Sequence, residues 1–229
     1  MFVREAYILA GPTASGKSAI AAELARETGA WILSADSMLV YKGMDIGTAK
    51  PSADERAEFH MGGVDIVTPA EEFSSGAWLR AAAEWAATVP DDVPVVIVGG
   101  TGLYFSALLR GLDRKWEKPP PEYPVIAADR AVLRERIRRR LDRMFAEGLE
   151  DERRRLHEAY PVWSRTAARA IGYREGDDAE RIFYRTCQLA KRQDTWFRHQ
   201  ATPIYVEPTA DAVRACWRAN GPWRVAFQG

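Results

Sequence analysis

The chain has 229 residues, which suits one large α/β domain or one domain with a small appendage. Hydrophobic residues make up 47% of the chain and charged residues 28%, a composition that indicates a globular protein and excludes an extensively disordered one. The 32 Lys and Arg residues balance 32 Asp and Glu residues, so the formal net charge of zero argues against a protein that coats nucleic acid indiscriminately.

The first half of the chain alternates short apolar strands with helices. Residues 7–10 are an apolar run that ends in Gly11-Pro12, which predicts a buried strand and then a turn. Apolar residues recur at helical spacing over 17–28, and Gly29 ends this predicted helix. The next predicted elements are a strand at 31–33, a strand at 64–67, a helix at 74–88, a strand at 94–98 and a helix at 101–109.

The second half begins with a break in this alternation. Residues 113–124 carry two lysines and three consecutive prolines, which indicate an exposed, stiff connection. The elements predicted after it are a strand at 125–128, a charged helical stretch at 130–160 broken near Gly148, an amphipathic helix at 177–199, a strand at 203–206 and a helix at 209–219. The whole pattern predicts an α/β fold, a P-loop NTPase-like and mostly parallel sheet with helices on both faces, in one domain over 1–229.

Cysteine usage and hydropathy point to the cytoplasm. The two cysteines, Cys187 and Cys216, have neither the spacing of metal ligands nor that of a disulfide framework. No signal-peptide pattern precedes the first predicted strand, and no apolar run approaches the roughly 18 residues that a membrane span needs. We therefore expect a cytoplasmic protein that does not associate with membranes, and nothing in the sequence demands a dimer, so we expect a monomer.

A phosphate-binding loop is the most specific local motif. Residues 11–18 are GPTASGKS and match G-x-x-x-x-G-K-[ST] at every defined position, directly after a predicted strand and before a predicted helix. In that context backbone N–H groups and the helix N-terminus surround phosphate oxygens, while Lys17 supplies charge and the Ser18 hydroxyl binds Mg²⁺. The residues predicted to bind the phosphates are Gly11, Thr13, Ala14, Ser15, Gly16, Lys17 and Ser18. The motif identifies a polyphosphate ligand but not a reaction.

Asp36 is the carboxylate best placed to act beside this loop. It follows the second predicted strand and should lie at the same sheet edge as the P-loop. There it would act as a general base or hold Mg²⁺ through water, and a turn or N-cap aspartate is the plainer alternative. The strand at 94–98 ends in Gly99-Gly100-Thr101 rather than in the Mg²⁺-linked aspartate of an ATPase. This weakens the ATPase interpretation and leaves a small-molecule kinase open.

Basic residues crowd two of the predicted helices. On the first, Arg136, Arg140 and Arg143 share one face; one face of this helix would meet a diphosphate and another would meet RNA. A solvated face paired with neighbouring acids is the alternative. On the second, residues 187–198 alternate basic side chains with Trp196 and Phe197. We expect these two aromatic residues to pack the helix onto the sheet rather than to stack on bases.

Six blocks together, in this order, resemble the tRNA dimethylallyltransferase family over nearly the whole chain. The blocks are GPTASGKS (11–18), ADSMLVYKGMDIGTAKP (35–51), VGGTGLYFSALLRGL (98–112), ERIRRRLDRMFAEGL (135–149), AIGYRE (170–175) and QLAKRQDTWFR (188–198). The second and last blocks are the ones specific to this family. Two features depart from the family pattern. The connection at 113–124 stands where family members carry a helical tRNA-binding insertion, and Met61-Gly62 replaces a histidine pair.

The resemblance implies a reaction and roles for individual residues. A dimethylallyl group would pass from dimethylallyl diphosphate to N6 of the adenosine adjacent to the anticodon, tRNA position 37, with Mg²⁺ on Ser18. Lys17 and Arg140 would stabilise the departing diphosphate, Asp36 would accept the amine proton, and Thr13 would line the channel. The residues expected to contact the tRNA anticodon stem-loop are Asp36, Ser37, Met38, Leu39, Thr101, Lys191 and Arg192.

Three other functions stay open at this point. An adenylate dimethylallyltransferase would use AMP, ADP or ATP as the acceptor and would need less apparatus to grip RNA. A P-loop kinase would phosphorylate a small metabolite. A nucleotide-binding module or an RNA-binding relic would have lost activity together with the insertion, although Lys17, Ser18, Asp36 and Arg140 are all present.

Overall fold

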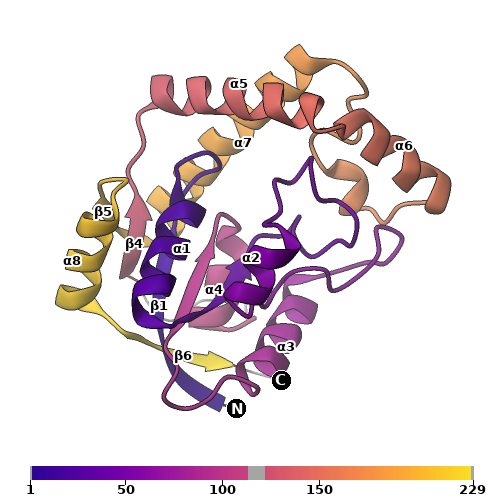
Figure 1. The fold of residues 1–229 in the computed structure, drawn as a ribbon. Coiled ribbons are helices and arrows are strands. Elements are labelled where there is room, and N and C mark those ends of the chain that lie inside the picture. The colour runs from indigo at the N-terminus through magenta and orange to yellow at the C-terminus, as the bar shows by residue number, and fades with distance from the viewer. Residues whose placement is uncertain (1, 113–121, 228–229) are drawn as a thin grey trace.

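A computed structural model describes residues 2–112 and 122–227. Its centre is a parallel sheet of five strands in the order β2-β3-β1-β4-β5, and a sixth strand, β6, pairs antiparallel with the first half of β1 (Figure 1). The strands are β1 (Phe2–Ala10), β2 (Trp31–Ala35), β3 (Val95–Gly99), β4 (Glu122–Ile126), β5 (Thr202–Val206) and β6 (Trp223–Phe227). The predicted fold class, a mostly parallel P-loop-type sheet covered by helices, is confirmed.

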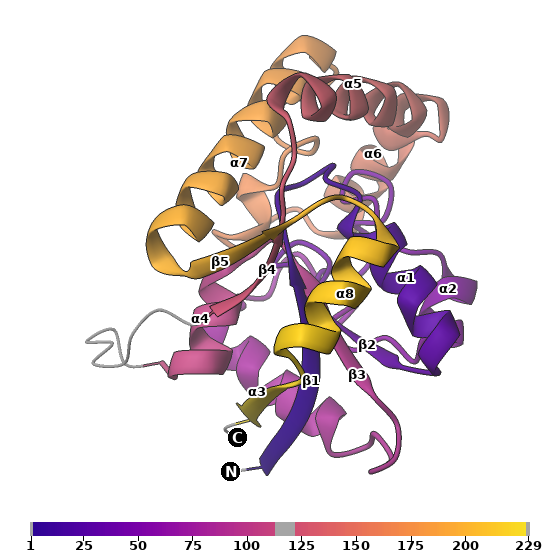
Figure 2. The ribbon, with the colours of Figure 1, turned by 90° about the vertical axis from the view of Figure 1, so that its left-hand side faces the viewer.

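Helices cover both faces of the sheet and its carboxyl edge. The helices are α1 (Lys17–Thr28), α2 (Ala53–Glu58), α3 (Ser75–Ala86), α4 (Gly102–Arg110), α5 (Arg130–Ala146), α6 (Leu149–Ala159), α7 (Ala179–Gln200) and α8 (Ala210–Asn220), with a 3-10 turn at Ala167–Arg169. On one face α1 and α8 bury Leu24 and Trp217 against the strands. On the other face α3 and α4 bury Trp78 and Phe105. Figure 2 shows these two layers on either side of the strands.

The helices α5, α6 and α7 form a lid above the carboxyl ends of the strands (Figures 1 and 2). They have a core of their own, in which Leu141 of α5 packs with Leu149 of α6 and Phe183 of α7. The long helix α7 joins this lid to the main domain, because Phe197 near its C-terminal end is fully buried in the core of the sheet. Side chains on α7 are therefore held in fixed positions relative to the strand ends.

The structure corrects several predicted elements. Residues 64–67 do not form a strand of the sheet, and Val67 makes only an isolated bridge to Tyr41. Strand β4 covers 122–126 instead of 125–128, so the last residues of the expected connection 113–124 pair with β5. Residues 113–121 of that connection lie outside the described residues. The predicted break near Gly148 is confirmed, because this glycine adopts a left-handed φ of 98° between α5 and α6.

Apart from the 3-10 turn, α2 and β6 have no counterpart in the sequence-based prediction. Helix α2 is only six residues long and exposes most of its surface, so it carries no apolar periodicity. It is defined instead by a capping box between Ser52 and Glu55. Strand β6 is defined by its pairing with the start of β1. No helix within the described residues is long and apolar enough to cross a membrane.

Candidate active site

The P-loop connects β1 to α1 and has the backbone shape that its motif requires. Gly16 has φ 94°, a left-handed conformation that favours glycine, and it directly precedes the first residue of α1. Ala14 also has a positive φ, of 63°. Three residues of this segment, Thr13, Lys17 and Ser18, line a cavity of about 620 Å³. The remaining predicted phosphate-binding residues, Gly11, Ala14, Ser15 and Gly16, form the loop backbone and are not among the residues that line this cavity.

Lys17 is a buried cation at the base of the cavity. Its Nζ donates to the Pro12 carbonyl oxygen at 3.3 Å, and no carboxylate of the described residues forms an ion pair with it. Burial lowers the pKa of Lys17 from its ordinary 10.5 to about 8; the negative charge of Asp36 opposes this shift, and the positive charge of Arg140 adds to it. A lysine held in this way gains from any anion that enters the cavity.

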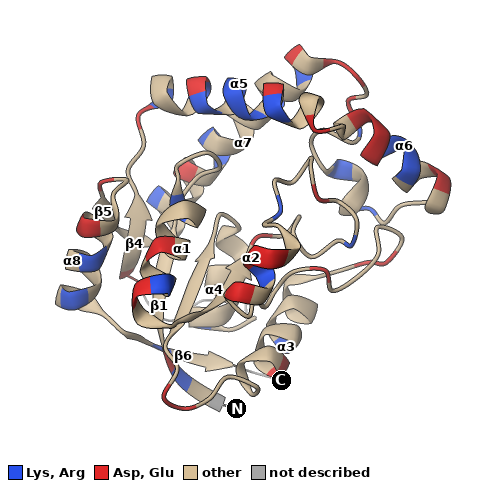
Figure 3. Ribbon diagram, viewed as in Figure 1, with Lys and Arg blue, Asp and Glu red and all other residues tan. Residues whose placement is uncertain are grey.

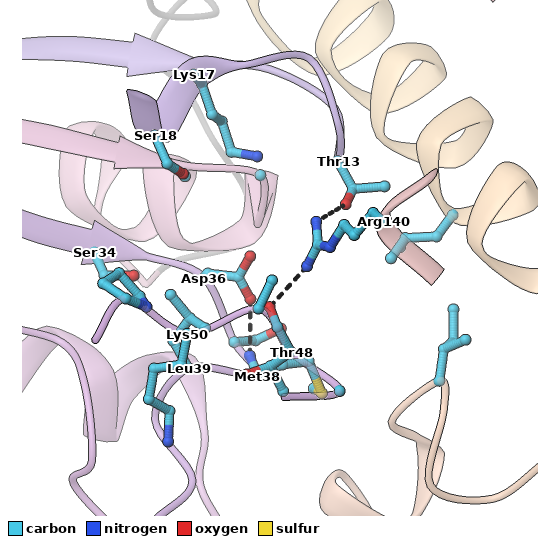
Figure 4. Close-up of a pocket in the computed structure, with 18 of the residues that line it drawn as sticks. Thr13, Lys17, Ser18, Ser34, Asp36, Met38, Leu39, Thr48, Lys50 and Arg140 are labelled. Carbon is cyan, nitrogen blue, oxygen red and sulfur yellow. Dashed lines mark hydrogen bonds between the residues drawn. The ribbon is translucent and has the colours of Figure 1, made fainter. Parts of the chain in front are cut away.

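Asp36 lies at the carboxyl end of β2, on the sheet edge where the sequence predicts it. Its Oδ1 accepts a hydrogen bond from the Met38 backbone N–H at 2.9 Å. In Figure 4 its carboxylate lies below the Lys17 side chain and beside the Arg140 guanidinium. Asp36 lines the cavity, and no hydrogen bond from the described residues reaches its second oxygen. This arrangement suits a general base better than a free turn aspartate, because one oxygen orients the group and the other can accept a proton.

Thr101 links the ends of β2 and β3. Its Oγ1 accepts from the Ser37 backbone N–H at 2.9 Å and donates to Ser37 Oγ at 3.2 Å. The two strands are neighbours with Ala35 opposite Gly99, so their carboxyl ends must meet here. Ser37, Met38, Leu39 and Thr101, all predicted to contact RNA, line the same cavity.

Arg140 reaches the cavity from the lid. Its guanidinium donates to Thr13 Oγ1 at 3.3 Å and to the Thr48 carbonyl oxygen at 2.9 Å (Figure 4). Burial lowers the pKa of Arg140, while Asp36 opposes the shift. Arg136, one turn earlier on α5, donates instead to the Ser15 carbonyl oxygen at 3.0 Å and so supports the P-loop backbone.

The other arginines of α5 do not face the cavity. Of the three that share a helix face, Arg140 lines the cavity, whereas Arg136 and the exposed Arg143 do not. Arg138 pairs with Glu180 at 2.6 Å, and Arg139 pairs with Glu135. Basic and acidic residues alternate along α5 and α6 in Figure 3. For these exposed positions the solvated, ion-paired alternative describes the structure.

The predicted residues of α7 fall into two groups. Arg192 is exposed and lines the rim of the cavity, whereas Lys191 is exposed outside it. Phe197 is buried as expected, and Trp196 packs so closely on α4 that a Cβ added to Gly102 would lie 2.1 Å from its ring. Both aromatic residues therefore act in packing.

Sequence reasoning missed a buried anchor beneath the loop that follows β2. Glu152 of α6 is 4% exposed. Its carboxylate accepts from the backbone N–H groups of Asp45 at 3.1 Å, Ile46 at 2.8 Å and Gly47 at 3.1 Å, and from the Tyr173 hydroxyl at 2.6 Å. This anchor fixes the loop whose next residue, Thr48, accepts from Arg140. Glu152 lies between the matching blocks 135–149 and 170–175. Nothing in its local sequence distinguishes it from the surface acids around it.

The cavity also offers an oxygen ligand for a cation. Within the described residues no group of three or more His, Cys, Asp or Glu side chains could hold a metal alone. Mg²⁺ rarely needs one, because it keeps several waters and binds phosphate oxygens through one or two protein ligands. The Ser18 hydroxyl lines the cavity beside Lys17, with Asp36 in the same space. These residues fit a Mg²⁺ ion that arrives with a diphosphate.

Comparison with known proteins supplies the family. The family model described as IPP transferase matches residues 39–125 and 114–200, and the one described as isopentenyl transferase matches residues 4–60. A tRNA dimethylallyltransferase of Geobacter metallireducens is 34% identical, over 87% of this chain and 91% of the relative. One from Methylococcus capsulatus is also 34% identical, over the same shares of the two chains.

A solved structure agrees with the fold. The crystal structure of the full-length tRNA isopentenylpyrophosphate transferase of Bacillus halodurans matches with a TM-score of 0.76 and 26% sequence identity, covering 90% of this chain and 91% of that one. The alignment with the Geobacter relative spans 283 positions, more than the 229 residues of this chain, so part of that relative has no counterpart here.

Proposed function

We propose a function from one premise: this chain belongs to the IPP transferase family, whose model matches residues from 39 to 200 and whose curated relatives cover most of its length. The enzyme transfers a dimethylallyl group from dimethylallyl diphosphate to N6 of the adenosine next to the anticodon, tRNA position 37. The single observation that carries this function is the convergence of Lys17, Asp36 and Arg140 on one cavity beside the P-loop.

The P-loop side of the cavity holds the donor. Thr13, Lys17 and Ser18 of the P-loop line this side, and Lys17 and Arg140 approach the diphosphate with positive charge. As the allylic C–O bond breaks, its electron pair stays on the diphosphate, and both cations stabilise the charge that develops there. Thr13 orients Arg140 through its hydroxyl. The Ser18 hydroxyl would hold a Mg²⁺ ion, which would neutralise part of the diphosphate charge.

The other side of the cavity receives the adenine. The lone pair of N6 forms the new C–N bond to the allylic carbon, and the proton that N6 loses passes to Asp36. An exocyclic amine is a weak nucleophile, so the reaction depends on a placed base and a close approach. A base inside this cavity must leave its stack, as enzymes that modify single bases require. Ser37, Met38, Leu39 and Thr101 line its path.

The tRNA acceptor is favoured over the other acceptors that the sequence leaves open. The Geobacter and Methylococcus relatives, each matched over 91% of its own length, are tRNA dimethylallyltransferases. We place Arg192 and Lys191 on the RNA side, because they are exposed at and beyond the cavity rim. The IPP transferase model matches in two stretches, 39–125 and 114–200, which meet at residues 114–125. This supports a single P-loop domain that is shortened where the family carries its helical insertion. The monomeric state and the cytoplasmic location stay predictions.

An acceptor comparison tests this function. Radiolabelled dimethylallyl diphosphate and Mg²⁺ are incubated with the protein and either an anticodon stem-loop with adenosine at position 37 or a mixture of AMP and ATP. We expect label in the stem-loop and none when that adenosine is replaced by guanosine. Label only in the mononucleotides would replace the tRNA by free adenylate as the acceptor. Label in neither acceptor, with the donor still bound, would show that this chain does not bind an acceptor productively.

A further inference from the structure

One side chain of the lid connects the two loops that the proposed reaction must bring together. Gln193 of α7 accepts a hydrogen bond from the Thr13 backbone N–H at 2.8 Å through its Oε1, and donates from its Nε2 to the Gly100 carbonyl oxygen at 3.0 Å. Thr13 belongs to the P-loop, and Gly100 precedes the Thr101 that lines the acceptor side. The orientation of the amide follows from its partners, since a backbone N–H can only donate and a carbonyl can only accept.

The connection is close and specific. A Cβ added to Gly100 would lie 2.4 Å from Gln193 Nε2, so glycine at this position permits the approach of the amide. The two loops are also joined at their bases, where the Gly11 N–H donates to the Gly99 carbonyl oxygen at 3.2 Å. Gln193 adds the link further out, next to the cavity that it helps to line.

The helix that carries Gln193 cannot easily shift. Phe197, one turn along α7, is fully buried in the core of the sheet, and the neighbouring Trp196 packs against Gly102 at the start of α4. The amide of Gln193 therefore starts from a position fixed by packing. An exposed glutamine would lose such hydrogen bonds to water, but this one is partly buried between two loops.

We propose that Gln193 is a positioning residue that sets the distance between the donor loop and the acceptor loop. This inference rests on the proposed function, since it takes Thr13 to lie at the donor and Thr101 at the acceptor. Gln193 touches neither reacting atom. It acts through the Thr13 backbone and the Gly100 carbonyl, and thereby holds the allylic carbon and N6 at reactive separation. Such alignment accounts for large rate effects, because a displacement of about 1 Å can cost about 10²-fold.

The first test compares two glutamines of the same helix. Gln193→Leu removes both hydrogen bonds, while Gln188→Leu makes the same change at an exposed position on α7. We expect Gln193→Leu to lower kcat by about 10- to 100-fold and to change KM for donor and stem-loop by less than about threefold. Gln188→Leu should match the wild type. A loss confined to KM in Gln193→Leu would make Gln193 a binding group and overturn the positioning role.

The second test uses the chemistry of the bridge. A carboxylate in Gln193→Glu can accept from Thr13 but repels the Gly100 carbonyl, whereas a protonated carboxyl accepts and donates as the amide does. The activity of Gln193→Glu relative to the wild type should therefore rise as pH falls from about 8 to 5.5. Taking the ratio at each pH removes every pH effect that the two proteins share. A ratio that does not change with pH would show that the donated hydrogen bond is irrelevant.

A measurement without turnover separates this proposal from the proposed function. Amide hydrogen exchange at Thr13 should become faster in Gln193→Leu and stay slow in Gln188→Leu, because only the first loses the acceptor of that N–H. If the wild type labels no RNA, the proposed function fails, and the exchange result still decides whether Gln193 holds the donor loop. Unchanged exchange in Gln193→Leu would overturn the bridge itself.

Discussion

Replacing Lys17 with methionine should make the ligand-free protein more stable and remove its affinity for the donor. Lys17 is buried, and within residues 2–112 and 122–227 its only hydrogen-bond acceptor is the Pro12 carbonyl oxygen. Lowering its pKa from 10.5 to about 8 corresponds to a cost of about 3 kcal/mol for carrying the charge in the folded state. Methionine has a similar length and carries no charge to desolvate.

The size of the gain depends on pH in a defined direction. The unfolded chain keeps the Lys17 proton up to about pH 10, whereas the folded protein releases it near pH 8. Between these values the unfolded state binds more protons, so the stability of the wild type rises with pH across this window, and the full cost is present below pH 8. We expect Lys17→Met to raise the free energy of unfolding by about 2–3 kcal/mol at pH 7 and by clearly less at pH 9.5.

Urea unfolding at both pH values measures this difference. Lys42→Met is the matched control, because Lys42 is exposed and its loss should change stability by less than about 0.5 kcal/mol. Titration calorimetry with dimethylallyl diphosphate should show at least about a tenfold loss of affinity in Lys17→Met and none in Lys42→Met. A Lys17→Met protein less stable than the wild type at pH 7 would refute the reasoning, since it would mean that the buried charge stabilises the fold.

Three further changes test the site and its supports. Asp36→Asn should lower turnover by about 10²- to 10⁴-fold with donor affinity within about threefold of the wild type, and an equal loss of donor affinity in calorimetry would make Asp36 a Mg²⁺-holding group instead. Glu152→Gln turns an amide NH₂ towards N–H and O–H donors, so the free energy of unfolding in urea should fall by about 2–4 kcal/mol. The exposed Glu158→Gln is the control and should lower it by less than about 0.5 kcal/mol. Similar values for the two variants would mean that the loop at 45–47 does not depend on its anchor. Phe197→Ala should cost about 3–5 kcal/mol in the same assay, and a cost below about 1 kcal/mol would contradict the role of α7 in joining the lid to the sheet.

Local sequence determined much of the main architecture. Short apolar strands that alternate with helices predicted the covered, mostly parallel sheet, because the periodicity of side chains follows directly from local backbone geometry. The GPTASGKS segment identified the phosphate-binding loop for the same reason, since its glycine, lysine and serine act within one turn of chain. The position of Asp36 at the same edge followed from its place after a parallel strand. The strand order, the antiparallel β6 and the irregular path of 64–67 did not follow from such patterns.

Only the tertiary structure decided which distant side chains complete the site. Gln193 and Thr13 are 180 positions apart, and Glu152 lies more than 100 positions from the loop it anchors. Nothing in the arginine spacing of α5 distinguished Arg136, which supports the P-loop backbone, from Arg140, which reaches the cavity. Such roles depend on how α5, α6 and α7 dock over the strand ends, and that docking is set by the combined burial of many apolar side chains rather than by any local pattern.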